Sequence, residues 1–308
     1  MKIGINASGG DNPVFTMLGA YNAAIANPEL DIWFYLGLRH AQMIDENIQM
    51  FPRAAQNLVI EEVEGHNDLN SALEDLRSGE IDALITGSNS KKLAACSHVS
   101  LLWQKPYWPG LIAPIPVQNG TGYMMDVGAT ARVTDPDVFV GWAELGTRFL
   151  QSQAGIASPK IGLCNIATER AYPELGLIHD RLTQQFANYV GYVEPYGYVA
   201  GEVDLWLVEG FMGNQNLKLL ESYMKLMAAE CLAVTCDSGD IGQLKKLFRN
   251  MFSYEAHLLS PYLTQSAKWV LRVHGAADHH AITKAFGLAA QKYDLTQPMW
   301  PSEAVALV

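Results

Sequence analysis

Basic residues are scarce in this chain. It carries 21 Lys and Arg against 32 Asp and Glu, which gives a formal net charge of -11 over 308 residues. Nucleic-acid grooves are lined with basic side chains because the phosphate backbone is negative, so this composition argues against nucleic acid as a partner. A small local pocket for an anion is still compatible with it.

Cysteines and long apolar runs are also few. The four cysteines have no CxxC spacing and are too sparse for a disulfide framework, so we expect them to be reduced: Cys96, Cys164, Cys231 and Cys236. No apolar run is long enough to span a bilayer, and the first expected strand begins at residue 2, which leaves no room for a leader. We therefore expect a cytoplasmic protein that is neither exported nor integral to a membrane.

Hydrophobic residues make up 49% of the chain, enough for one large core or two ordinary ones. Apolar spacing predicts strands over residues 2–6, 32–36, 58–63, 81–86, 123–127, 160–166, 203–208 and 269–273. It predicts helices from residues 13 and 68 and over 91–103, 136–151, 173–189, 214–233, 241–259 and 278–292. The proline-rich stretch 105–116 is expected to be extended chain at an edge or a crossover. This alternation predicts a single α/β domain over 1–308, with a mostly parallel sheet and helices on both faces.

Polar motifs follow six of the expected strands. They are NASGGDN, TGSNS, DVGA, NIATE, EGFMGN and HGAAD. In a parallel sheet the carboxyl ends of the strands share one edge, where open α/β folds bind ligands, so we expect the six motifs to line one cleft. Each motif taken alone is also explained as a turn that needs small polar residues.

The first of these motifs lies at a strand-to-helix turn. Asn12 is expected to cap the helix and Pro13 to be its first residue, which would leave the amides from Ser8 to Asp11 free to bind an anion. A tight turn that merely needs glycine at Gly9 and Gly10 explains the same residues. The sequence leaves both interpretations open.

In their order, the motifs resemble those of the PlsX family, the acyl-carrier-protein:phosphate acyltransferases. The resemblance runs from residue 1 to about residue 290 and rests on Gly9-Gly-Asp-Asn12, Gly87-Ser-Asn89, Asp126-Val-Gly-Ala129, Asn165-Ile-Ala-Thr-Glu169, Gly210-Phe-Met-Gly-Asn214 with Lys218, and His274-Gly275 with Asp278. It implies a fold similar to isocitrate and isopropylmalate dehydrogenases and a homodimer. It also implies transfer of a fatty acyl group from acyl-carrier protein to phosphate, with no cofactor. A projecting helical pair over 214–259 is implied as the dimer contact.

Such a reaction needs donors for phosphate and for the developing oxyanion, and it needs no metal. Asn89, Asn165 and Asn214 can donate through their side-chain amides, and His274 can act as a general acid or as a fixed donor. A structural histidine explains His274 equally well. We therefore take His274, Asn89 and Asn214 as the catalytic candidates. The substrate-binding candidates are the other motif members and two nearby cations: Gly9, Gly10, Asp11, Ser88, Lys91, Asp126, Arg132, Asn165, Thr168, Glu169, Gly213 and Asp278.

Several positions depart from the family pattern. Asn6 replaces the usual aspartate, Ser88-Asn-Ser-Lys91 replaces Gly-Asn-Thr-Gly, and Arg132 and Arg170 stand where the family carries other residues. These cations can rebuild an anion site, since guanidinium groups bind phosphate and carboxylate in a bidentate manner. Solvated loop charges explain Lys91 and Arg170 at least as well.

Three functions are therefore compatible with the sequence. The first is acyl transfer from acyl-carrier protein to phosphate, and the second is acyl transfer of a specialised pathway with another small acceptor or donor. The third is a non-catalytic scaffold that binds acyl-carrier protein. We also expect no stable membrane binding, because the connection within the helical pair carries Asp237 and Asp240 and no bulky aromatic residue.

Overall fold

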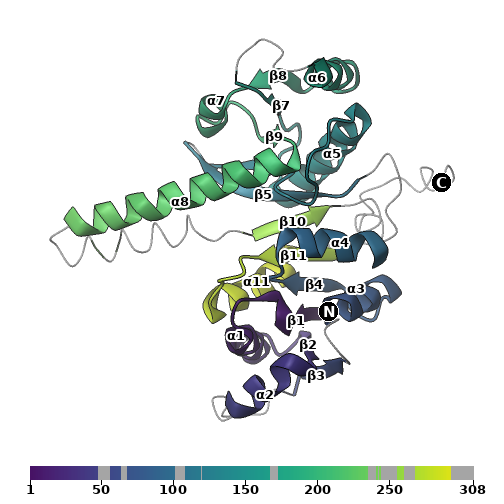
Figure 1. The fold of residues 1–308 in the computed structure, drawn as a ribbon, viewed down its shortest axis with the longest axis vertical. Coiled ribbons are helices and arrows are strands. Elements are labelled where there is room, and N and C mark those ends of the chain that lie inside the picture. Colours follow the sequence, from purple (N-terminus) through teal and green to yellow (C-terminus); the bar gives the residue numbers. More distant parts are fainter. Residues whose placement is uncertain are drawn as a thin grey trace.

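The computed structural model describes residues 1–47, 56–63, 68–100, 108–118, 120–166, 173–234, 241, 243, 255–259 and 268–292. One sheet of 11 strands runs through them (Figure 1), in the order β3-β2-β1-β4-β11-β10-β5-β6-β9-β7-β8. The strands are β1 Lys2–Asn6, β2 Asp31–Gly37, β3 Leu58–Val63, β4 Ala83–Thr86, β5 Gly110–Val117, β6 Gly120–Met125, β7 Ile161–Cys164, β8 Tyr189–Val193, β9 Leu205–Leu207, β10 Glu255–Leu259 and β11 Trp269–Val273.

The helices lie on both faces of this sheet. They are α1 Pro13–Ala26, α2 Leu38–Asn47, α3 Asp68–Ser78, α4 Ser90–Ser100, α5 Pro136–Phe149, α6 Pro173–Gln185, α7 Pro195–Val199, α8 Gly210–Val234 and α11 His279–Lys292. A short 3-10 turn, Ala7–Gly9, precedes α1, and a π turn, Leu150–Ala154, ends α5. The expected alternation of strands and helices is confirmed.

Successive strand residues point into two different cores, as the pleat of a strand requires. Ile3, Ile5 and Leu271 pack with α1, α5, α6 and α11 on one face. Leu84 and Val270 pack with α3, α4, α7 and α8 on the other face. Arg272 is two residues from Val270 and His274 is four, so this alternation directs Arg272, and His274 just beyond the strand, toward the face that carries α4 and α8.

The sheet contains two parallel blocks that run in opposite directions. Strands β3, β2, β1, β4 and β11 are parallel to one another. Strand β10 is antiparallel to both β11 and β5, and β5 is antiparallel to β6. Strands β6, β9, β7 and β8 are again mutually parallel. The reversal means that the motifs after β1, β4 and β11 lie at one edge and those after β6, β7 and β9 at the other. The expectation that all six share one sheet edge is therefore wrong.

The proline-rich stretch is a strand inside the sheet rather than an edge or a crossover. Strand β5 pairs with β6 along its length, but its register with β10 extends only from Gly110 to Ile112. Pro114 and Pro116 lie beyond that register, where a missing N–H breaks no bond to β10. The expected helix over 241–259 is also wrong at its end, since Glu255–Leu259 forms β10. Most of its other residues lie outside the described ranges.

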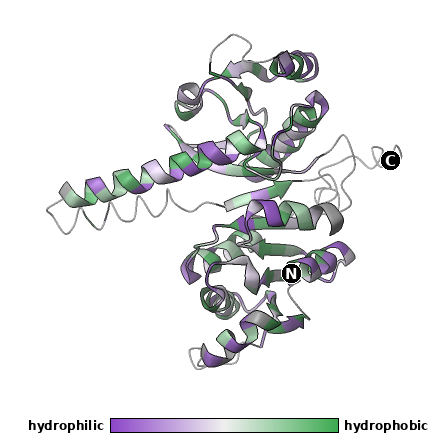
Figure 2. Ribbon diagram, in the orientation of Figure 1, coloured by the Kyte–Doolittle hydropathy of each residue, from purple (hydrophilic) through white to green (hydrophobic). Residues whose placement is uncertain are grey.

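Helix α8 projects from the body of the molecule (Figure 1). It has 25 residues, and apolar and polar residues are interspersed along it (Figure 2). Leu217 packs on the sheet, whereas apolar side chains farther along are exposed: Leu219, Tyr223, Leu226 and Met227. Among the described helices, none is both long enough and apolar enough to cross a membrane.

Candidate functional site

The loop after β1 is held mainly by hydrogen bonds to other parts of the protein. The Ser8 amide donates to Asp68 at 2.7 Å, and the Asp11 amide donates to the Gly275 carbonyl at 2.7 Å. The Asn12 side chain accepts bonds from the first free amides of α1, as its predicted role as N-cap requires. The amides of Ser8 and Asp11 are therefore not free for an anion, which corrects the expectation for these two amides.

The two glycines of this loop meet protein atoms. A methyl group at Gly9 would lie 2.8 Å from the Gly87 nitrogen, and one at Gly10 would lie 2.8 Å from the Thr16 hydroxyl. Close approach of two backbone segments explains the glycine at residue 9 without a ligand. Next to these glycines, the Ser8 hydroxyl donates to the buried Asp68 and lies 3.3 Å from the Lys92 ammonium.

Asp126 organises the loop after β6. Its fully buried carboxylate accepts bonds from four backbone amides, those of Leu111, Gly128, Ala129 and Thr130, and from the Thr130 hydroxyl, at 2.8 to 2.9 Å. Burial raises the pKa of Asp126, and these bonds oppose that shift. Both carboxylate oxygens of Asp126 accept hydrogen bonds from the protein. Asp126 is therefore a structural residue, and the expected role in binding substrate is not supported.

The start of α8 packs against this loop. A methyl group at Gly213 would come within 1.9 Å of the Asp126 carbonyl oxygen, and Gly210 is similarly close to Thr130. Gly213 therefore permits close helix packing. The Asn214 side chain borders Gly128, which places this catalytic candidate where α8 leaves the loop.

The candidates around β4 and β11 have separate roles. The Asn89 side-chain oxygen caps α4 by accepting the Lys92 amide at 2.8 Å, and its amide group has no bond within the described part of the chain. Ser88 is buried, and its carbonyl accepts a 2.9 Å bond from the Arg272 Nε. Asp278 caps α11 through the Ala281 amide, so the structure gives it a helix-capping contact.

Other candidates are isolated or not described. Lys91 and Arg132 are exposed and form no ion pair with any residue in the described ranges. Asn165 is buried at the end of β7, where its side-chain oxygen accepts the Ile166 amide. Thr168, Glu169 and Arg170 lie outside the described residues.

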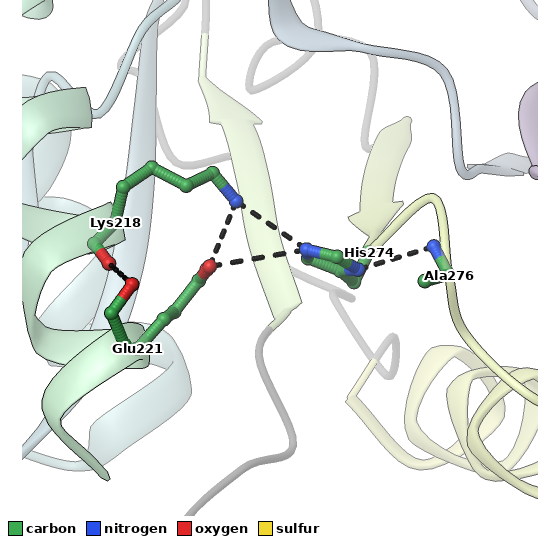
Figure 3. Close-up of polar contacts among 5 residues, drawn as sticks. Lys218, Glu221, His274 and Ala276 are labelled. Atoms are coloured by element: carbon green, nitrogen blue, oxygen red, sulfur yellow. Dashed lines mark hydrogen bonds and ion pairs between the residues drawn. The ribbon is translucent and has the colours of Figure 1, made fainter. Parts of the chain in front are cut away.

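One group of charged side chains connects the two parallel blocks. Helix α8 begins beside the Asp126 loop and carries Asn214, Lys218 and Glu221 at the i, i+4 and i+7 spacing of one helix face. Figure 3 shows that Lys218 and Glu221 point toward His274, which follows β11. The Lys218 ammonium lies 2.8 Å from the Glu221 carboxylate and 3.4 Å from His274 Nε2. Helix α8 therefore brings residues of the two parallel blocks together, although their strands do not end at the same edge of the sheet.

The hydrogen bonds define the form of His274. Its Nδ1 accepts the Ala276 amide at 3.1 Å, so the neutral ring carries its proton on Nε2. Burial and then Lys218 lower the pKa of His274, with smaller lowering by Lys225 and Arg272 and an opposing effect of Glu221. At pH 7 the imidazole is therefore neutral and presents an N–H toward α8.

Arg272 is the other cation of this group. It lies two residues before His274 and directs its side chain to the same face of the sheet, beside the start of α4. Burial lowers the pKa of Arg272 and Glu221 raises it, but a guanidinium remains charged at neutral pH. Lys218, Arg272 and the His274 N–H together can bind an oxyanion. The described residues contain no cluster of three metal-ligating side chains.

Sequence reasoning missed three members of this group as site residues. They are Lys218, Glu221 and Arg272. The signal for Lys218 was its place with the Gly210–Asn214 motif in the family resemblance, for Glu221 its helical spacing from Asn214, and for Arg272 its place two residues before His274. The reversal of the sheet hid these signals, because all six motifs were expected at one edge of the sheet.

Comparisons with known proteins identify relatives in sequence and in fold. The chain is 30% identical over 230 residues to a phosphate acyltransferase of Aeromonas salmonicida, covering 70% of this chain and 66% of that protein. It is 26% identical over 318 residues to one of Lacticaseibacillus casei, covering 92% and 89%.

Two solved structures share the fold. A branched-chain phosphotransacylase from Enterococcus faecalis superposes with a TM-score of 0.58 at 14% identity, covering 95% of this chain and 99% of that one. A 4-hydroxythreonine-4-phosphate dehydrogenase from Salmonella typhimurium gives 0.52 at 11% identity, covering 94% and 98%. At these identities the likeness concerns the fold alone.

Fold and relatives define this protein as an α/β enzyme of the acyltransferase class. Residues 1–297 match the model of the family described as fatty acid synthesis protein, and the chain belongs to that family, the PlsX family.

Proposed function

We propose that the protein transfers an acyl group from acyl-carrier protein to inorganic phosphate and releases an acyl phosphate. A phosphate oxygen attacks the thioester carbonyl carbon, the carbon–sulfur bond breaks, and the carrier thiolate takes a proton. The observation that carries this proposal is the contact of Lys218 with His274, which gathers anion-binding groups from α8 and β11 in a family of phosphate acyltransferases.

The residues of this group have roles that match the requirements of the reaction. Lys218 and Arg272 hold the phosphate oxygens, since charge-assisted bonds to phosphate are the stronger ones. The neutral His274 donates its Nε2–H to the developing oxyanion, which favours the fixed donor over the general acid. Asn214, one helical turn before Lys218, and Asn89, beside the Ser88–Arg272 contact, are further amide donors.

Trapping of acyl phosphate with hydroxylamine tests the activity. Wild-type protein is incubated with acyl-carrier proteins of several chain lengths, with and without phosphate, and the acyl hydroxamate is measured. Phosphate-dependent hydroxamate formation supports the proposal, and its absence with every donor contradicts it.

Variants test the acceptor site in the same assay. Loss of one charge-assisted bond in Lys218→Met should raise the KM for phosphate by about 10- to 100-fold. Arg132→Ala tests whether that exposed cation also supplies charge to the anion; an unchanged dependence on acceptor concentration would rule that role out. Lys160→Met, an exposed lysine outside the proposed acceptor site, serves as the matched control.

The shift of cations relative to the family pattern supports a second candidate, acyl transfer to another small acceptor. A panel of phosphate, phosphorylated and carboxylate acceptors separates the two. Activity with phosphate alone favours the first proposal. Hydrolysis or transfer only to another acceptor favours the second, and binding of acyl-carrier protein without any turnover would indicate a scaffold.

A further inference from the structure

Glu221 is a nearly buried carboxylate within the charged group. Its side chain is 6% exposed, whereas that of Lys218 is 50% exposed and that of His274 is 35% exposed. A buried carboxylate is costly unless it is paired and hydrogen-bonded. Its Oε2 lies 2.8 Å from the Lys218 ammonium and 3.9 Å from His274 Nε2, so one carboxylate oxygen faces both groups.

We infer that Glu221 is a positioning residue, whose carboxylate holds the Lys218 ammonium and the His274 imidazole, from two separate elements, in one arrangement. The inference rests on the proposed function in one respect, because it takes Lys218 and His274 as the groups that meet the substrate. Glu221 itself does not touch the reacting atoms.

The contact between Lys218 and His274 requires a third group. Since His274 Nδ1 accepts the Ala276 amide, Nε2 carries a proton when the ring is neutral. The 3.4 Å approach of Lys218 Nζ to Nε2 then brings two donors together, and they do not attract each other. An acceptor facing both donors resolves this conflict, and Glu221 is in that place (Figure 3).

Charge gives Glu221 a second effect on the site. The charged groups near His274 come from α8 (Lys218, Glu221 and Lys225), from β11 (Arg272), from the loop after β1 (Asp11, beside Gly275) and from its own loop (Asp278). Lys218, Lys225 and Arg272 lower the pKa of His274, and Glu221 raises it. Glu221 therefore offsets part of the positive field that makes protonation of His274 unfavourable.

Titration of His274 by NMR tests this role without any substrate. With isotope-labelled histidine, the His274 signal is assigned as the one missing from His274→Gln. Glu221→Gln keeps the size of the side chain but removes its charge, so the His274 midpoint should move to lower pH. Glu221→Asp keeps the charge at a shorter reach and should give a midpoint nearer to wild type. Glu230→Gln, an exposed glutamate on the same helix, is the matched control and should leave the midpoint in place.

Kinetics supply the second readout. In Glu221→Gln we expect kcat to fall about 10- to 100-fold, since misplacement of about 1 Å has effects of this size, with a smaller change in KM. In Glu221→Asp, kcat should stay reduced even though the charge is kept, because the carboxylate no longer reaches both partners. Any limb of the rate profile that depends on His274 should move to lower pH in Glu221→Gln together with the NMR midpoint.

The outcomes separate this inference from the proposed function. If the wild type makes no acyl phosphate, the proposed function fails, while a shifted midpoint in Glu221→Gln still supports the positioning role. An unchanged midpoint, or wild-type turnover in Glu221→Gln, overturns the inference. If Glu221→Gln does not fold, Glu221→Asp decides instead: its kcat should stay reduced although the charge is kept, and wild-type turnover in Glu221→Asp overturns the inference.

Discussion

Polar residues that follow the strands of this protein differ in what their side chains contact. Asp126, Asn12, Asn89 and Asp278 accept bonds from backbone amides of their own loops and helix ends. His274 instead meets side chains from a different element. The first kind of contact satisfies backbone donors that folding would otherwise leave unpaired, and the second joins side chains of two separate elements.

This difference decides how far the sequence could define the site. An Asn or Asp after a strand predicts a capping residue and a ligand-binding residue equally well, because both need a short polar side chain. The N-cap role of Asn12 was predicted and is confirmed. The structural contacts of Asp126 could not be recognised from the sequence, since one of its donors, the Leu111 amide, is distant in sequence.

Replacement of Asp126 by asparagine should destabilise the protein. The carboxylate accepts five bonds, and an amide group in place of one oxygen would face donors and leave at least one of them unpaired in a buried place. We expect Asp126→Asn to lower the free energy of unfolding by about 1–3 kcal/mol, measured by urea denaturation. Asp31→Asn, at an exposed position, is the control, and equal stability of the two variants would contradict the structural role.

The rate of acyl phosphate formation should depend on the charge of His274. Burial and Lys218 lower its pKa, so the imidazole is neutral at pH 7 and takes a second proton only below the ordinary histidine value of about 6.5. That proton goes to Nδ1 and breaks the bond from Ala276. Activity should therefore hold from pH 8 to 7 and fall at lower pH.

The measurement is the ratio of wild-type to His274→Gln rates across pH 5 to 8. Titration of phosphate is common to both proteins, so the ratio isolates the histidine. We expect the ratio to decrease below pH 6.5, the ordinary histidine value. A ratio that increases as the pH falls would show that the protonated imidazole is the active form.

At the scale of elements, most strands and helices were predictable from the sequence, and the strands β8 and β10 were not. Strand β8 was not predicted, and its first residue, Tyr189, was taken as the end of a helix, whereas β10 was taken as helical. Both are strands because adjacent strands offer backbone partners, and β10 has such a partner on each side. Local sequence does not contain that information.

Helix α8 is expected to form a dimer contact. Leu219, Tyr223, Leu226 and Met227 are each more than half exposed, which is more apolar surface than a projecting helix normally leaves uncovered. A second copy of the helix would cover them. We expect light scattering during gel filtration to give twice the chain mass of 33.9 kDa.

Substitution on α8 tests this contact. Tyr223→Glu combined with Met227→Lys should weaken the dimer so that the mass falls toward that of one chain on dilution. Phe15→Glu, an exposed aromatic on α1, is the control and should leave the mass unchanged. A wild-type protein with the mass of one chain, or a dimer that the α8 variant leaves intact, would contradict the prediction.

At the scale of the whole molecule, the fold class was predictable from the alternation of strands and helices. The reversal of strand direction within the sheet was not predictable from it. The three antiparallel pairings that reverse it involve β5 and β10, and only the structure reveals them. Consequently the group of Lys218, Glu221 and His274 forms across the two blocks through α8. A site assembled by a helix that crosses between oppositely directed strands is a property of the complete fold.

We also expect that the protein does not bind stably to membranes. Its formal charge of -11 opposes approach to an anionic surface, as do Asp237 and Asp240, which follow α8 in the sequence and lie outside the described residues. Against this, each lysine or arginine near the surface contributes about 1 kcal/mol of attraction, and Lys245, Lys246 and Arg249 follow in the sequence. We expect the protein to remain in the lower fractions when liposomes rich in anionic lipid are floated at physiological salt.

The double variant Asp237→Lys with Asp240→Lys should float to a greater extent, because it changes the sign of the charge at these two positions. Co-migration of the wild type with the liposomes at that salt would refute the prediction.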